Sequence, residues 1–291
     1  MDPLNRTRLT TDGLRTEVLK LGEPNPKSSD IENLPDRSSS AAQRILILGG
    51  TREGTELATR LAARKDLASI YSFAGRVSRL RYPEGSTRVG GFGGIDGLIS
   101  YLLTENITAV VDATHPFSVT ISRNIEIACA RLKLPLIAFT RPEWLRRNGD
   151  LWHEMATFED AANAVDTMNG RVFLSIGRQE VGCFAVCNDV WFLIRAIEEP
   201  TGKLPRHHQM LLQRGPFDLK EELQLLRDYS IDYIVSKNSG GSGTYTKIEA
   251  ARLLGIPVVM VKRPVKHTIP VAETVDDVVL KLAELSQSRT V

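Results

Sequence analysis

The stretch RILILGGTREGTELATRLAAR, residues 44–64, reads as a strand, a glycine-rich turn and a helix. Backbone N–H groups in such a turn and in the first helical turn are unpaired, and the helix dipole helps them to bind an anion. We expect Gly49 to let the chain turn sharply and Gly54 to allow close packing of the helix on the strand. Gly50 and Thr51 would bring a backbone or hydroxyl group close to a phosphate, although Thr51 stands where a dinucleotide fingerprint has its second glycine. The alternative is an ordinary βα turn with structural glycines.

The next apolar run, residues 67–74, predicts a second strand and bears on the choice of cofactor. A site for NAD usually ends this strand with Asp or Glu, which binds the ribose hydroxyls. No acid stands here, and Ser72, Gly75 and Arg76 suit a 2′-phosphate through charge-assisted hydrogen bonds. Arg52, in the first turn, adds a second positive charge. The sequence therefore predicts NADP rather than NAD; the alternative is that these arginines are only solvated surface.

Composition excludes several classes of protein. The chain has 291 residues, 42% of them hydrophobic, and a net charge of +2, which argues against a nucleic-acid-binding protein with a dominant basic face. Its three cysteines form no disulfide framework and suit a reducing cytosol, so we expect a cytoplasmic location. No apolar run approaches the roughly 20 residues of a membrane-spanning helix, so we expect no membrane partner.

The chain from Arg44 onward alternates short apolar strands with amphipathic helices. Because the strands are apolar almost throughout, we expect burial on both faces and parallel sheets, hence an α/β fold with two domains and a cleft between them. We expect an NADP-binding domain over residues 44–145 and a second α/β domain, which binds the substrate, over residues 146–291. Residues 1–43 contain no aromatic residue and scattered charges, which predicts a disordered extension.

Several segments together resemble the precorrin-6A reductase family of cobalamin biosynthesis: LILGGTREGTELA, SFAGRV, VDATHPFS, RPEW and SKNSGGSGTYTKIEAARLLGIPVVMVKRP. The resemblance runs from Arg44 to the C-terminus, and its most specific parts are DATHPF and SKNSGGSGTYTKIEAA. It implies two Rossmann-like domains, with NADPH mainly on the first and the macrocycle in the cleft between them. It also implies NADPH-dependent reduction of one double bond of precorrin-6A, at ring D, to give precorrin-6B.

The segment VDATHPFS, residues 111–118, follows a predicted central strand at the sheet edge where ligands bind in open parallel sheets. We expect Asp112 and Thr114 to contact the cofactor, although Asp112 equally suits a turn-forming role. His115 is the candidate catalytic residue, as a proton donor near the nicotinamide or as a contact of the macrocycle. The alternative is a turn histidine that fixes the loop before Pro116.

A second glycine-rich turn, SKNSGGSGTYTK, follows the predicted strand DYIV. Exposed backbone N–H groups and the Lys237 charge would form an anion site for the acetate and propionate groups of a precorrin. The alternative is a flexible glycine linker. We predict that this turn and Arg178, in another βα turn, bind substrate, through Arg178, Ser236, Lys237, Asn238, Gly240, Gly241 and Thr244.

Other features leave alternatives open. Cations also stand at predicted strand ends or in adjoining loops, at Arg141, Arg195, Arg214 and Arg263, and Trp144 suits either stacking on the macrocycle or packing between domains. Cysteine and histidine spacing predicts no metal site. The rival functions are a non-catalytic NADP-sensing module and a reductase of a smaller anionic metabolite. The sequence leaves open whether the substrate carries cobalt and what the oligomeric state is, a monomer included.

Overall fold

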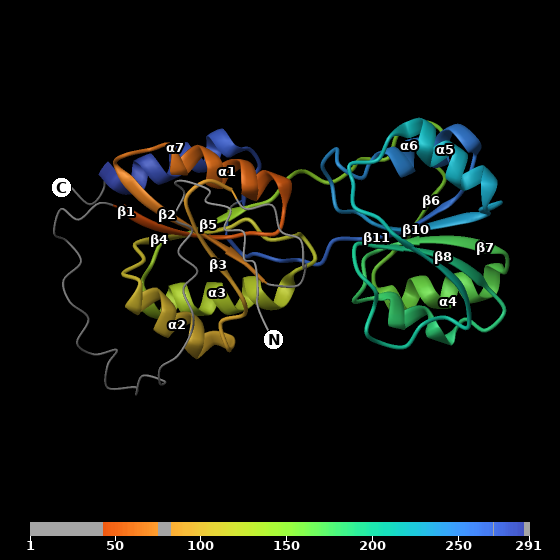
Figure 1. Ribbon diagram of the computed structural model, residues 1–291, viewed down its shortest axis with the longest axis horizontal. Helices are drawn as coiled ribbons and strands as arrows, with labels where there is room; N and C mark the ends of the chain where they lie inside the picture. The colour runs from red at the N-terminus through yellow and green to blue at the C-terminus, as the bar shows by residue number, and fades with distance from the viewer. Residues whose placement is uncertain (1–42, 75–82, 270, 288–291) are drawn as a thin grey trace, which may run out of the picture.

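The computed structural model describes residues 43–74, 83–269 and 271–287. It contains two parallel six-stranded sheets, each covered by helices on both faces (Figure 1). The α/β class with two Rossmann-like sheets is therefore confirmed. Apart from Gln43, the predicted N-terminal extension lies outside the described residues.

The first sheet has the doubly wound order β12-β5-β4-β1-β2-β3, with every pair of neighbours parallel. The chain enters at the centre in β1, winds outward to β3, then crosses back and winds to the opposite edge. The winding direction therefore reverses between β1 and β4, and ligands bind at such a switch point in open α/β sheets. Its strands are β1 (Gln43–Leu48), β2 (Leu67–Phe73), β3 (Ser86–Val89), β4 (Ala109–Asp112), β5 (Leu136–Phe139) and β12 (Val271–Ala272).

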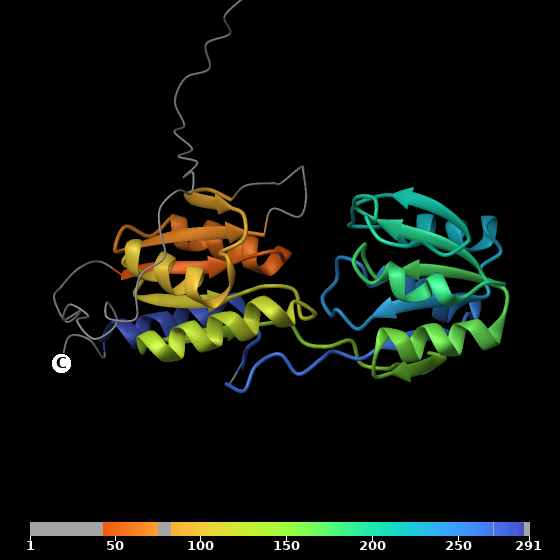
Figure 2. The same cartoon turned by 90° about the horizontal axis from the view of Figure 1, so that it is seen from below.

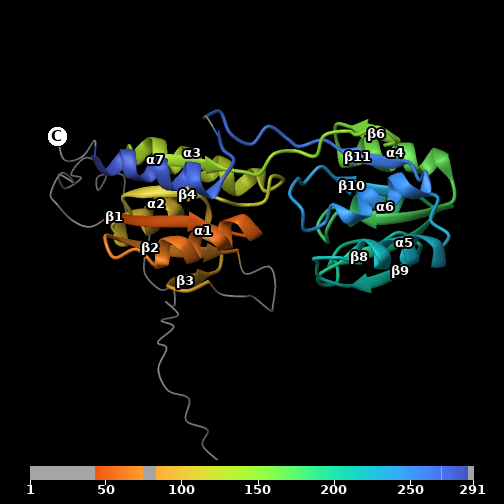
Figure 3. The ribbon, with the colours of Figure 1, turned by 90° about the horizontal axis from the view of Figure 1, so that it is seen from above.

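Two hydrophobic layers lie on either side of this sheet. Figure 1 shows the helices that cover them above and below the strands, and Figures 2 and 3 look onto the sheet from below and from above. Side chains of β1 alternate between the layers: Ile45 and Ile47 pack into one, Leu46 and Leu48 into the other. Such burial on both faces explains the continuous apolar run that marks the strand in the sequence. The first layer lies under α1 (Arg52–Ala62) and α7 (Val275–Gln287), and the second under α2 (Gly94–Thr104) and α3 (Val119–Leu132).

The second sheet has the order β6-β11-β10-β7-β8-β9, again parallel throughout. One face packs on α4 and a 3₁₀ segment, η2, and the other on α5 and α6. These elements are β6 (Trp152–Met155), α4 (Phe158–Met168), β7 (Arg171–Ser175), η2 (Val181–Val186), β8 (Trp191–Ala196), β9 (His207–Leu212), α5 (Leu219–Asp228), β10 (Tyr233–Lys237), α6 (Thr246–Leu254) and β11 (Val258–Val261).

The predicted boundary of the second domain, residues 146–291, differs from the structure at its C-terminal end. The strand β12 pairs with β5 of the first sheet, and α7 packs against α1, where Asp276 forms an ion pair with Arg60. The chain therefore leaves the first sheet after β5, builds the second, and returns to complete the first. A two-residue strand carries no periodicity, so nothing local in the sequence signals this return.

Two further elements went unpredicted, and one was predicted wrongly. The strand β6 and helix α4 fill the stretch before β7, and Thr157 with Asp160 forms a capping box at the start of α4. That Thr-x-x-Asp spacing is the sequence signal that could have located the helix. The segment QEVGCFAVC, residues 179–187, predicts a helix from its sequence, but it forms only the short 3₁₀ segment η2, which buries Val181 and Phe184.

The return of the chain predicts that a residue of α7 stabilises the first domain. Leu282 is 0% exposed in the layer under α1, so Leu282→Ala is expected to lower the free energy of unfolding by about 2–5 kcal/mol. Leu280, on the same helix, is 61% exposed, and Leu280→Ala serves as the control, with a change of about 0.5 kcal/mol or less. Denaturant titration measures both values. Equal small effects would show that α7 does not belong to this core.

Candidate active site

The carboxyl ends of the two sheets meet, and one arginine connects them. Arg141 follows β5 of the first sheet, and its Nε donates to the carbonyl of Ser239, after β10 of the second, at 2.8 Å. Its Nη1 donates to Glu53 Oε2, in the first turn of α1, at 2.7 Å. Arg263, after β11, donates to the carbonyls of Arg141 and Asn238, both at 2.8 Å. This junction therefore joins the two edges at which parallel sheets bind ligands.

Packing explains the glycines of the first turn. A Cβ on Gly49 would lie 2.0 Å from the ring of Tyr71, whereas Gly50 has a φ of +132° and open space around it. The Gly50 amide donates to the Tyr71 hydroxyl at 3.1 Å. A Cβ on Gly54 would lie 3.0 Å from Ala113 Cβ, so the predicted close packing of helix on strand is confirmed. The unusual backbone conformation falls on Gly50, while Gly49 makes room for the Tyr71 ring.

Thr51, in place of the expected second glycine, is the N-cap of α1. Its hydroxyl accepts from the Gly54 amide at 3.0 Å and donates to the Ala113 carbonyl at 2.9 Å. The hydroxyl therefore fixes this turn against the end of β4, rather than standing ready for a phosphate. The next two amides, of Arg52 and Glu53, have no intrahelical acceptor and form the open, positive end of the helix dipole. Arg52 itself is exposed.

The end of the second strand holds an arginine that sequence reasoning missed. Ser72 is buried, and its hydroxyl accepts from Arg88 Nη1, on β3, at 2.8 Å. Arg88 also donates to the carbonyls of Gly90 and Gly91 and stacks 3.8 Å from the Phe92 ring centre. Burial lowers the pKa of this guanidinium. Arg88 is the register partner of Ser72, so a correct β2–β3 alignment would have revealed it.

Two predicted residues of this region, Gly75 and Arg76, lie outside the described residues.

Asp112 organises the loop after β4. Its Oδ1 accepts from the amide and hydroxyl of Thr114, at 3.0 and 2.6 Å, and the whole residue is buried. On the other side, Lys266 Nζ lies 3.4 Å from Oδ1 and His267 Nε2 lies 3.1 Å from Oδ2. Burial opposes ionisation, but the bond to His267 and the Lys266 charge outweigh it and hold the pKa of Asp112 well below its usual range. Asp112 and Thr114 therefore fix this loop, as the turn-forming alternative for Asp112 has it, and their contact with a cofactor stays a prediction.

His267 connects the returning chain to the first sheet. Its ring lies between two carboxylates, 3.1 Å from Asp112 and 2.9 Å from Glu126 of α3. Burial lowers the pKa of this histidine, but the two carboxylates outweigh burial and raise it. The segment between β11 and β12 is thus fixed by charge to the loop that carries His115. The sequence pattern gave no signal for this contact, since the partners lie far apart in the chain.

His115 is half-buried and lies within a cluster of cations. Its Nδ1 accepts from the Phe117 amide at 3.3 Å, which places the proton of the neutral ring on Nε2. Burial, followed by the surrounding positive charges, lowers the pKa of His115 to about 3. The imidazole is therefore neutral at pH 7 and a poor proton donor in this state, although Nε2–H can donate a hydrogen bond. The cations are Lys237, Arg141, Lys266 and Arg263.

The second glycine-rich turn is packed rather than open. A Cβ on Gly240 would lie 2.0 Å from the Pro142 carbonyl oxygen, and one on Gly241 would lie 2.6 Å from Arg141 Cδ. Both glycines have left-handed φ values, +65° and +71°. The turn therefore accommodates the close approach of the segment after β5, and this contradicts the predicted role of Gly240 and Gly241 in an exposed anion site.

Two more predicted substrate contacts hold the same turn together. The side chain of Asn238 binds the Trp144 backbone twice. Its Oδ1 accepts from the Trp144 N–H at 2.9 Å, and its Nδ2 donates to the Trp144 carbonyl at 3.1 Å. Trp144 itself is buried, and its indole donates to the Gly241 carbonyl at 2.7 Å. Ser236 is fully buried at the end of β10. Asn238 and Ser236 are thus structural, and Trp144 packs at the junction instead of being free to stack on a ligand.

The predicted substrate residue Lys237 faces the loop after β4 of the first sheet. Its Nζ is 5.1 Å from the ring centre of Phe117, beside His115, and 2.9 Å from Glu180 Oε2. Burial lowers the pKa of Lys237, while Glu180 raises it. Arg178 is ion-paired with Glu198 at 2.7 Å, and Thr244 is half-buried just before α6. Lys237 therefore joins Arg141 and Arg263 among the predicted cations that the structure brings to the junction.

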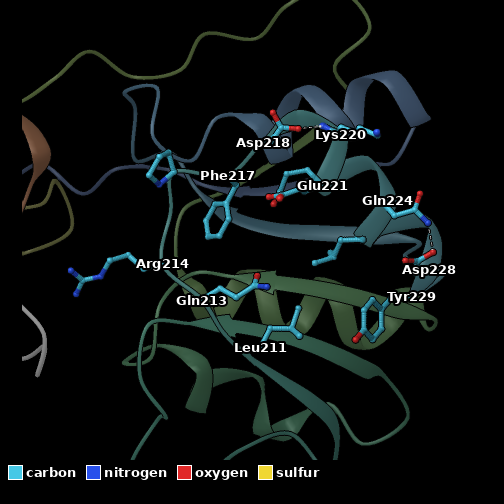
Figure 4. A pocket seen from close by; sticks show the side chains of 13 residues that line it. Leu211, Gln213, Arg214, Phe217, Asp218, Lys220, Glu221, Gln224, Asp228 and Tyr229 are labelled. Carbon is cyan, nitrogen blue, oxygen red and sulfur yellow. Dashed lines mark hydrogen bonds between the residues drawn. The ribbon is translucent and has the colours of Figure 1, made fainter.

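A groove of about 900 Å³ lies between β9 and α5 (Figure 4). Arg214, one of the strand-end cations named from the sequence, lines it, but none of the predicted cofactor, catalytic or substrate residues does. Acidic side chains outnumber basic ones along its wall, which disfavours a ligand with many carboxylates. Its charged residues are Arg214, Lys220, Asp218, Glu221, Glu222 and Asp228.

The described residues hold neither a cluster suited to a metal ion nor a helix suited to a membrane. Within residues 43–74, 83–269 and 271–287, no three side chains of His, Cys, Asp or Glu gather in a way that could hold a metal ion. In the same ranges, no helix combines the length and apolar character needed to cross a bilayer.

The Asp112–His267 contact predicts a stability change with a definite pH dependence. Because the folded pKa of His267 is raised, its contribution is complete below the unfolded pKa and is lost as pH rises through the folded pKa. Asp112→Asn is expected to lower the free energy of unfolding by about 3–5 kcal/mol near neutral pH. It is also expected to lower the folded pKa of His267, so that the His267 contribution to stability disappears at a lower pH than in the wild type. Denaturant titrations over a pH series measure both effects.

The control for this prediction is Asp228→Asn, which changes an exposed carboxylate at the end of α5. It is expected to leave the pH dependence unchanged. If Asp112→Asn also left it unchanged, the charged contact to His267 would not stabilise the loop.

Comparisons with known proteins agree with this architecture. A sequence model of the family "Precorrin-6x reductase CbiJ/CobK" matches residues 44–283. The "Precorrin-6A reductase" of Rhodococcus erythropolis is 48% identical over 235 residues, which covers 81% of this chain and 94% of the relative. The "Cobalt-precorrin-6A reductase" of Methanocaldococcus jannaschii is 28% identical over 254 residues, covering 83% and 98%. A solved structure, "CobK precorrin-6A reductase", is 37% identical with a TM-score of 0.79. The match covers 84% of this chain and 97% of the chain in that structure. The chain therefore belongs to the precorrin-6x reductase CbiJ/CobK family of oxidoreductases.

Proposed function

We propose that this chain reduces one double bond of precorrin-6A with NADPH, giving precorrin-6B in cobalamin biosynthesis. The observation that carries the proposal is the cation cluster around His115, where the carboxyl edges of both sheets meet. A macrocycle with many carboxylates needs such a positive surface, and a hydride donor needs a dinucleotide site beside it. The names of the relatives and of the solved structure support the same substrate.

The first sheet would hold the cofactor. The N-terminal end of α1 offers the amides of Arg52 and Glu53, and the open space around Gly50 leaves room for a pyrophosphate. The buried Ser72–Arg88 pair places a positive charge, and no acid, at the end of β2. These features fit a 2′-phosphate and support NADPH over NADH. NADPH supplies the hydride, and the chain positions it against the macrocycle.

The second sheet would hold the macrocycle. Lys237 is its cation closest to His115, through the intervening Phe117 ring. Neutral His115 is assigned a hydrogen bond from Nε2–H to the macrocycle, in place of the predicted proton transfer. We assign a metal-free substrate, since the relative with the higher identity is named for precorrin-6A and the relative named for cobalt-precorrin-6A is only 28% identical. A cytoplasmic location is part of the proposal.

Anaerobic turnover and cofactor binding test this function directly. With precorrin-6A present, the protein is expected to oxidise NADPH with one equivalent consumed per macrocycle reduced. NADPH is expected to bind at least about tenfold more tightly than NADH, the effect of one charge-assisted hydrogen bond. Binding of NADPH without turnover would favour the NADP-sensing module, and turnover of a smaller anionic metabolite alone would favour the second rival.

A substitution at Lys237 tests where the macrocycle binds. Lys237→Met removes a charge at the junction, so the KM for precorrin-6A is expected to rise about tenfold while the Kd of NADPH stays constant. Lys262→Met is the matched control, because Lys262 is exposed and pairs with Glu154 at the end of the same sheet. An unchanged KM in Lys237→Met would remove this residue from the substrate site.

A further inference from the structure

Reduction of a carbon–carbon double bond consumes a hydride and a proton, and neutral His115 is a poor source of that proton. His115 is neutral at pH 7 because burial and four cations lower its pKa to about 3. His267 is held between two carboxylates at the edge of the first sheet. A titratable group elsewhere at the junction is therefore the better candidate for delivering the proton. This inference rests on the proposed function.

Lys247 is a buried cation with an unusual set of partners. It lies in the first turn of α6 and is 5% exposed. Its Nζ donates to Ser175 Oγ at 3.1 Å and to the Ser175 carbonyl at 3.4 Å, and it lies 5.7 Å from the Trp144 ring centre. No carboxylate of the described residues lies within ion-pair distance of this ammonium. A lysine buried without an ionic partner costs stability, so its presence calls for a function.

The charges around Lys247 make both of its protonation states accessible. Burial, followed by the Arg195 charge, lowers the pKa of Lys247 to about 7, with Lys237 acting in the same direction and Glu222 against it. The Glu222 carboxylate is committed to Arg195, at 2.7 Å, so it compensates Lys247 only in part. These groups face Lys247 from β8, α5 and β10. A group that gains and loses a proton near pH 7 is well suited to general acid catalysis.

Ser175 connects Lys247 to the junction. It is the last residue of β7, is half-buried, and lies in register with Ser236 of β10. Two residues later, a Cβ on Gly177 would lie 3.9 Å from Lys237 Nζ. Lys237 in turn lies over Phe117, whose ring centre is 5.8 Å from that of His115. The Ser175 hydroxyl is therefore at the carboxyl edge of the second sheet, beside the residues assigned to the macrocycle.

We propose that Ser175 delivers the proton for the reduction and that Lys247 replenishes it. The hydride from the reduced nicotinamide forms a C–H bond at one end of the double bond, and the electron pair of the broken π bond takes a proton from the Ser175 hydroxyl. The Lys247 ammonium returns a proton to Ser175 and becomes an amine, which solvent reprotonates. One hydride and one proton are consumed, and the cofactor leaves oxidised.

Substitutions at both positions separate proton transfer from charge. Lys247→Met is expected to lower kcat about 100-fold or more and to abolish the fall of kcat as pH rises through 7, since the ammonium is the active form. Lys247→Arg keeps the charge but cannot release its proton, so it is expected to be equally slow. Ser175→Ala is expected to be as slow as the two Lys247 variants. Ser175→Thr keeps a hydroxyl and is expected to keep most of the activity. The exposed Lys220, on α5, provides the control Lys220→Met, with an unchanged profile.

Two measurements do not depend on turnover. NMR of side-chain ¹³C-labelled lysine is expected to show one lysine that titrates near pH 7 in the wild-type protein and is missing in Lys247→Met. Lys247→Met is also expected to bind NADPH normally and to be no less stable than the wild type, because it removes a buried charge. If Lys247 were only structural, Lys247→Met would be less stable than the wild type and would keep the wild-type pH profile of kcat.

The outcomes distinguish this inference from the function on which it rests. If the wild-type protein fails to reduce precorrin-6A with NADPH, the proposed function is wrong. If the wild-type protein turns over while Lys247→Met and Ser175→Ala keep its kcat and pH profile, the function stands and the relay is overturned.

Discussion

The guanidinium of Arg141 holds the carboxyl edges of the two sheets together, and the arrangement of the site depends on it. Its Nη1 donates to Glu53, in the first turn of α1, and its Nε donates to the carbonyl of Ser239, after β10. Both charged side chains are largely buried, at 16% and 27% exposure, so the pair is screened less than an exposed one, which contributes about 0–1 kcal/mol. Any ligand on the α1 turn therefore lies next to the loop of the second sheet.

Polar residues at this junction have two different tasks. Most of those in the sequence motifs fix loops: Thr51 caps α1, Asp112 holds Thr114 and His267, and Asn238 binds the Trp144 backbone. Buried polar groups need such partners, and satisfying them makes the loops rigid. Lys237, which is paired with Glu180, and His115, which accepts from the Phe117 amide, are consequently placed with little freedom. Such rigidity suits a reaction in which alignment of donor and acceptor carbons supplies much of the rate.

The fold was largely predictable because its strands are apolar throughout and its helices are amphipathic. The failures arose where pairing is non-local: β12 has two residues, and its place beside β5 depends on the whole intervening sheet. In the site, the glycine turn and the cation Lys237 were found from local spacing. Local spacing could not show that Gly240 and Gly241 pack on the segment after β5, that Arg88 lies beside Ser72, or that Lys247 is buried without an ionic partner.

The most direct test of the central claim, that catalysis takes place where the two carboxyl edges meet, is a crystal structure of the protein with NADP⁺ and precorrin-6B. The account predicts the pyrophosphate at the N-terminal end of α1 and macrocycle carboxylates within hydrogen-bond distance of Lys237, with the reduced ring beside His115 and Ser175. A macrocycle bound in the groove between β9 and α5, or an adenosine phosphate on the second sheet, would contradict it.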